Sequence, residues 1–140
     1  MPQPYDGWLD RELAQAPLEL QRPWTISRKW EKVGGGRIMF GEVTLTAAPS
    51  QAFSFTEEIT WPTDYPYFKR CVLDGILDAV FIDLAGAPSH VSFVLNEIKW
   101  HEATSVPHAY YRAAREAVEE VFAEDERASF ASLLERTKRE

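Results

Sequence analysis

Cysteine is nearly absent from this 140-residue chain, and the single one, Cys71, has no partner for a disulfide within the chain. Small secreted domains commonly depend on disulfides, so a reducing compartment is expected. The first residues lack the basic cluster and apolar run of a secretory signal, and no stretch is apolar for long enough to span a bilayer. We therefore expect a cytoplasmic protein without a membrane partner.

Motifs for metal and nucleotide binding are also missing. His90, His101 and His108 lack the close spacing of a helical zinc pair, and one cysteine cannot complete a structural zinc set. The glycines at 34–36 precede Arg37 without the lysine and hydroxyl of a phosphate-binding loop. We expect no metal, no cofactor and no GTP binding by this chain.

Residues suited to catalysis do not combine into a recognisable arrangement. Asp74 and Asp78 lie four residues apart on a predicted helix and off its apolar stripe, so we interpret them as solvated acids. His101 beside Glu102 could act as a general base, but no serine or cysteine nucleophile can be paired with it. Cys71 lies on an apolar helix face and is interpreted as core filler. We expect a protein that is not an enzyme.

Positive charge is scarce, because 15 Lys and Arg stand against 22 Asp and Glu, for a net charge of −7. Proteins that bind nucleic acid need positive charge where they meet phosphates, so broad nonspecific RNA binding is disfavoured. One local basic strip exists, formed by Arg28, Lys29 and Lys32 with Arg37 nearby. Taken alone, such a strip is also typical of the solvated edge of a strand.

The periodicity that is present indicates one domain between two extensions. Residues 1–23 carry four prolines around a short helical pattern, which predicts an arm that packs back through Trp8, Leu9 and Leu13. Residues 24–123 hold the organised pattern of strands and helices. Residues 124–140 are rich in charge, with apolar residues at helical spacing, and we predict a helical extension there.

Alternation of apolar residues predicts strands near 24–30, 43–47, 53–59 and 90–100, and helices near 68–80 and from 105 onward. A shift of apolar parity predicts a bulge near Asn96 and Glu97. The order β-β-β-α-β-α predicts an α+β fold, with one mixed sheet of about four strands, two main helices on one face, and short N- and C-terminal helical extensions. The stripes predict a buried set of Phe53, Phe55, Val72, Ile76, Val91, Phe93, Tyr110 and Ala114.

Four blocks in this order resemble domain IV of elongation factor G and of related translational GTPases, including the ribosomal-protection proteins. The blocks are GGGRIMFGEV (34–43), the apolar and glycine positions between 53 and 76, LAGAP (84–88) and HEATSVPHAY (101–110). Together they span a length typical of one domain. The resemblance implies a split β-α-β fold with a left-handed crossover, here without an attached GTPase.

The resemblance also implies a functional tip made of two loops. In these GTPases the corresponding loops reach the decoding centre of the ribosome and help to move tRNA and mRNA. The residues that occupy these loops here are Gly34, Gly35, Arg37, His101, Glu102, Thr104 and Ser105. Ile38 and Met39 stand where the family usually has small or polar residues, and Thr104 stands where it usually has an acid.

Two functions are compatible with these observations. The first is a non-catalytic, translation-factor-like module that engages the ribosome or structured RNA through its tip, helped by the basic strip. The second is a protein-interaction module derived from such a domain, with no ribosome role and an unidentified protein partner. Ile38 and Met39 would anchor that partner. The acidic composition of the chain favours this second function.

Overall fold

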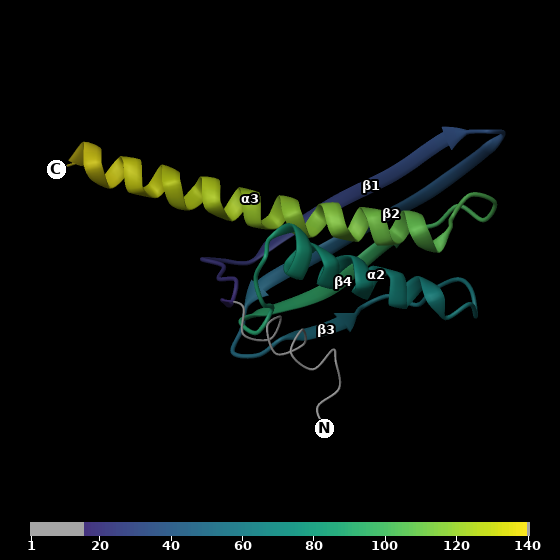
Figure 1. Cartoon of the computed structure of the whole chain (residues 1–140), viewed down its shortest axis with the longest axis horizontal. Helices are drawn as coiled ribbons and strands as arrows, with labels where there is room; N and C mark the ends of the chain where they lie inside the picture. Colours follow the sequence, from purple (N-terminus) through teal and green to yellow (C-terminus); the bar gives the residue numbers. More distant parts are fainter. Residues whose placement is uncertain (1–15, 140) are drawn as a thin grey trace, which may run out of the picture.

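The computed structural model describes residues 16–139, which form one sheet and two long helices (Figure 1). In chain order the elements are β1 (Trp24–Gly34), β2 (Arg37–Pro49), β3 (Ser54–Glu57), α2 (Tyr67–Asp78), η1 (Ala79–Asp83), β4 (Val91–Lys99) and α3 (Pro107–Arg139). The predicted order and the α+β class are confirmed. The predicted packing of Trp8, Leu9 and Leu13 and the short helix around them lie outside the described residues. The C-terminal extension is the uninterrupted continuation of α3.

The sheet is mixed, as predicted, with strand order β1-β2-β4-β3. β2 pairs antiparallel with β1 and β4, whereas β3 pairs parallel with β4. The register of β2 against β4 shifts between Thr44, which pairs with Glu97, and Leu45, which pairs with Leu95. Asn96 is therefore the extra residue of a β-bulge, at the predicted position.

The connection from β3 through α2 to β4 is a left-handed crossover. Figure 1 shows the helices in front of the sheet, with β3 and β4 running in the same direction and β4 above β3. The chain leaves β3, returns in front of the sheet as α2 and enters the strand above. Parallel crossovers are right-handed in roughly 98% of cases. The opposite hand here agrees with the expectation drawn from the sequence resemblance.

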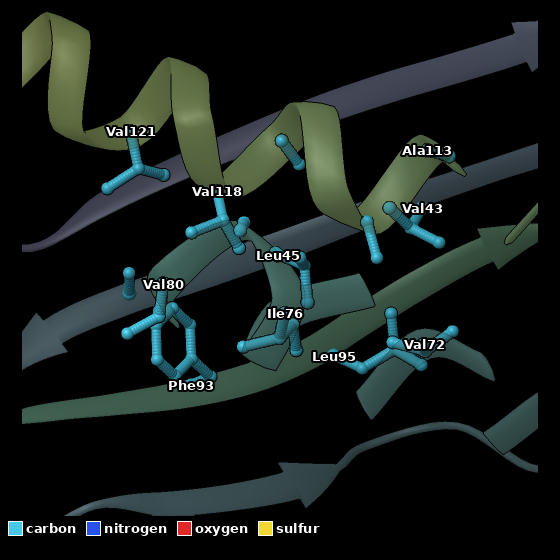
Figure 2. Packing of buried hydrophobic residues seen from close by; sticks show 14 of the residues in the cluster. Val43, Leu45, Val72, Ile76, Val80, Phe93, Leu95, Ala113, Val118 and Val121 are labelled. Atoms are coloured by element: carbon cyan, nitrogen blue, oxygen red, sulfur yellow. The ribbon is translucent and has the colours of Figure 1, made fainter. Parts of the chain in front are cut away.

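The core lies between one face of the sheet and the two helices (Figure 2). Alternate residues of β2 and β4 point to this face and are fully buried, and they meet apolar side chains from α2, η1 and α3. Most of the predicted core set is buried, but Phe53 is 37% exposed and Phe55 is only half-buried. The reason is that Phe53 precedes a four-residue edge strand, where its ring has Phe93 on one side, 6.3 Å away between centroids.

Two glycines allow α3 to lie directly against β2 and α2. A Cβ atom on Gly41 would lie 2.6 Å from the backbone of Ala109, and one on Gly75 would lie even closer to the carbonyl oxygen of Tyr111. Real Cβ atoms do not approach backbone so closely. The first turns of α3 can therefore reach both elements only because these two positions have no side chain.

A buried carboxylate joins the beginning of the domain to α3. Asp125 accepts hydrogen bonds from the backbone N–H of Gln21, at 3.2 and 3.1 Å, and from Nε1 of Trp24, at 2.8 Å. A buried polar group is tolerated when it is hydrogen-bonded, and Asp125 has two partners, Gln21 and Trp24. Within residues 16–139, no helix combines the length and apolarity that crossing a bilayer requires.

We predict that Gly75→Ala destabilises the domain by about 1–3 kcal/mol, because the added methyl overpacks the contact between α2 and α3. In an open helix the same change is stabilising by about 1 kcal/mol, so the sign of the effect tests the contact. Gly34→Ala is the matched control, since a Cβ there meets no atom within 4 Å. Urea unfolding followed by circular dichroism measures both, and equal stability of Gly75→Ala and the unaltered protein would contradict the close approach.

Candidate functional site

The first loop of the predicted tip is the tight turn that joins β1 to β2. Gly34 is the last residue of β1 and pairs with Arg37, the first residue of β2. The two residues between them, Gly35 and Gly36, have φ of 59° and 76°. Two consecutive positive φ values define a two-residue hairpin turn of the type that matches strand twist, and glycine adopts them without strain. The glycines therefore carry the long hairpin outward to an exposed end.

The second loop joins β4 to α3 and is held by Ser105. The Ser105 hydroxyl accepts a hydrogen bond from the backbone N–H of His101, at 2.9 Å, and lies 2.9 Å from the hydroxyl of Tyr110. Tyr110 in turn donates to the carbonyl oxygen of Lys99, at 2.5 Å. Ser105 was predicted as a tip residue, but its hydroxyl is used to shape the loop. Glu102 is also engaged, because it accepts a hydrogen bond from Nε1 of Trp100 at 2.9 Å.

The two loops lie side by side through Phe40. Its backbone N–H donates to the carbonyl oxygen of Thr104, at 2.9 Å, and its carbonyl oxygen accepts from the N–H of Val106, at 3.3 Å. The ring of Phe40 meets the imidazole of His101 edge to face, with centroids 4.2 Å apart. Figure 1 shows the hairpin and the loop at the same end of the sheet. The two loops that hold the predicted tip residues are thus joined by a pair of backbone hydrogen bonds at Phe40.

The predicted basic strip is not one surface. Side chains of successive strand residues point to opposite faces, so Arg28 and Lys29 diverge. Arg28 lies on the helix side, where it pairs with Glu120 at 3.3 Å and Glu116 at 3.9 Å on α3. Lys29 is on the other face, opposite Glu42 in the register, whereas Lys32 shares the face of Arg28 and lies opposite Met39. Lys32 and Arg37 are the exposed cations close to the turn, and by the same alternation they lie on the face of Arg28, so only Lys29 is separated from the predicted strip.

The tip carries an exposed apolar pair that includes the predicted Ile38 but has Val33 in place of Met39. Val33 and Ile38 are register partners across the hairpin, and they are 71% and 47% exposed. Partners in an antiparallel pair point to the same face, so these two side chains form one small apolar patch. Met39 is half-buried and points to the opposite face of the hairpin. The tip consequently presents two exposed cations, Lys32 and Arg37, together with an apolar patch.

A second polar cluster, on the helices, was missed by sequence reasoning. Arg115 binds Asp83 through two hydrogen bonds of 2.6 Å and donates to the hydroxyl of Tyr111 at 2.7 Å. Tyr111 donates to Asp78 at 2.5 Å. The interpretation of Asp78 as a solvated acid is therefore wrong, since it helps to fasten α2 to α3. The available signal was the four-residue spacing of Tyr111, Arg115 and Glu119 on one helix face.

The protonation of this cluster is perturbed in both directions. The hydrogen bonds from Arg115 hold the pKa of Asp83 at about 2. A hydrogen bond to Asp83, together with burial, raises the pKa of Glu119 to about 7. Glu119 can therefore be protonated near neutrality and donate a hydrogen bond to the Asp83 carboxylate. Beside this cluster Tyr65, Tyr67, His108 and Tyr111 line a shallow groove of about 660 Å³.

Cys71 borders the same groove and is partly buried. Burial and the nearby Asp74 carboxylate raise the pKa of its thiol, which keeps it in the less nucleophilic form. Among the described residues, no three His, Cys, Asp or Glu side chains gather closely enough to hold a metal ion. The groove thus contributes packing and hydrogen bonds, whereas the tip presents free charged and apolar groups.

We expect Glu119 to make stability depend on pH. Its pKa is raised from 4.5 to about 7 in the folded protein, so its contribution is complete below about pH 4.5 and is lost as pH rises through about 7. Glu119→Gln keeps a donor for Asp83 at every pH and should flatten the decline in unfolding free energy between about pH 5 and 8. Glu135→Gln, on the exposed end of α3, is the control. Identical pH profiles for Glu119→Gln and the unaltered protein would show that Glu119 is not protonated at neutrality.

Comparison with known proteins adds a fold relationship. No protein-family model and no curated protein matches this chain. A solved crystal structure of a protein from Thermus thermophilus is similar, with a TM-score of 0.67 over 76% of this chain and 26% identical residues. The match covers 16% of that protein, so this chain spans about a sixth of its length. The α+β fold described above is therefore shared with one part of a much longer protein.

Proposed function

We propose that this protein is a non-catalytic module resembling domain IV of elongation factor G, and that it engages the ribosome or structured RNA through its tip. Three features support the proposal: the left-handed β-α-β crossover, the sequence blocks at both tip loops, and the likeness to one part of a longer protein. The observation that carries most weight is the direct joining of the two loops at Phe40.

Charge distribution favours an approach by the tip. The tip segments, residues 29–42 and 101–105, contain three bases (Lys29, Lys32 and Arg37) and three acids (Glu31, Glu42 and Glu102), so their net charge is zero. The whole net charge of −7 therefore lies outside the tip. A polyanion such as RNA is repelled by the body and meets least repulsion at the hairpin. Lys32 and Arg37 are then the groups placed to contact phosphates.

Binding of purified ribosomal subunits and of a fluorescent RNA hairpin, measured across salt concentrations, tests this function. We expect Arg37→Glu to weaken binding and to lower the log–log salt slope by about one for each lost phosphate contact. Arg22→Glu makes the same charge change two residues before β1, at the end of the sheet away from the tip, and should have little effect. Ribosome binding that is unchanged by both Arg37→Glu and His101→Ala would remove the tip from consideration.

A second candidate function is protein binding through the same tip, and the exposure of Val33 and Ile38 favours it. Apolar residues of this kind act as anchors when a partner covers them. We expect Ile38→Asp to abolish such binding, with only a modest effect of salt. Ile82→Asp, at another exposed apolar residue on η1, is the control. Pulldown from lysate with and without RNase separates the candidates, because RNase releases an RNA-mediated partner and leaves a protein-mediated one bound.

A further inference from the structure

The last third of α3 extends away from the domain. Figure 1 shows this end of the helix running past the edge of the sheet. Asp125 is the last buried residue of α3, and every side chain from Ser129 to Lys138 is exposed. Helices in proteins are stabilised mainly by packing of an apolar face. This segment has such a face but no packing partner among the described residues.

The apolar face consists of Phe130, Leu133 and Leu134, which are 61%, 58% and 47% exposed. Residues three and four apart lie on the same side of a helix, so the three form one stripe. Val121 points into the core, and Phe130 follows it by nine positions. At about 100° per residue, nine positions amount to half a turn beyond two full turns. The stripe therefore faces away from the sheet, and a partner can reach it without meeting the body of the domain.

Charge is unevenly divided along α3. All six charged residues from 116 to 126 are acidic, namely Glu116, Glu119, Glu120, Glu124, Asp125 and Glu126. Arg127 follows this acidic segment and pairs with Glu124, and near the end of the helix the cations Arg136 and Lys138 follow Glu135. Two such helices in parallel would align acid with acid and base with base. Two antiparallel helices place the basic end of each beside the acidic segment of the other, so the helix complements a reversed copy of itself.

We propose that the stripe is covered by the stripe of a second copy of this chain, with the two α3 ends packed antiparallel around a two-fold axis at the height of Ser132 along the helix. In this register Phe130 of each copy lies opposite Leu134 of the other, and Leu133 flanks this pair. The same register places Glu126 opposite Lys138 of the second copy. Such a contact is isologous and closes on itself, as two-fold dimers do. The tip takes no part in it, so the dimer is independent of the proposed function.

The size of the stripe makes the dimer a concentration-dependent one, since three large apolar residues from each copy form a small interface. Sedimentation velocity of the full chain over a concentration series up to ~1 mM should show the 16.0 kDa species converting to one of twice that mass. The variant Phe130→Glu/Leu134→Glu should remain monomeric throughout. Ile82→Glu introduces one new charge at an exposed apolar residue elsewhere and should dimerise normally. Circular dichroism checks that each variant is folded.

Exchange of charges tests the antiparallel register. Lys138→Glu places two acids together and should raise the dissociation constant about tenfold or more. Glu126→Lys should do the same, whereas the double variant Glu126→Lys/Lys138→Glu restores opposite charges and should recover the original affinity. A chain that stays monomeric, a dimer insensitive to Phe130→Glu/Leu134→Glu, or a double variant as weak as the single ones would overturn the proposal.

Discussion

The arrangement of this domain depends on how closely α3 approaches its neighbours. Gly41 and Gly75 remove the side chains that would otherwise keep the helix away from β2 and α2. Because the helix is seated there, Tyr110 is fully buried and its hydroxyl reaches Ser105 and Lys99. Those bonds shape the loop that lies beside Phe40. The tip is therefore positioned by close backbone contacts at Gly41, next to Phe40, and at Gly75 on α2, two residues without side chains of their own.

Sequence periodicity was sufficient to predict the strands and helices, the bulge and most of the buried core. Each of these depends on which side of a strand or helix a residue occupies. Asn96 illustrates this, since a change of parity along a single strand already indicates an extra residue. Phe53 illustrates the limit. Its place in the apolar pattern was correct, but the pattern carries no information on how many neighbours an edge strand has. Burial at an edge is decided by tertiary structure.

The candidate site was predictable only in part, for the same physical reason. The grouping of the two loops came from resemblance to a family and not from periodicity, which cannot report on contacts between segments about 60 residues apart. Arg28 was assigned to a basic surface because its sequence neighbours are basic. Its actual neighbours are Glu116 and Glu120, 88 and 92 residues later in the chain. Similarly, Asp78 was interpreted from the sequence as a solvated acid. In the structure its carboxylate accepts a hydrogen bond from Tyr111 of another helix.

The pairing of Asp125 with Gln21 and Trp24 divides α3 into two parts with different thermodynamic character. Opening the helix from its end as far as residue 126 leaves these hydrogen bonds intact. Opening it one residue further leaves a buried carboxylate and an indole N–H without partners and frees the start of β1. Amide hydrogens on the two sides of this boundary therefore belong to different cooperative units in the monomer. Exchange with solvent is expected to be local beyond it and to require opening of the domain before it.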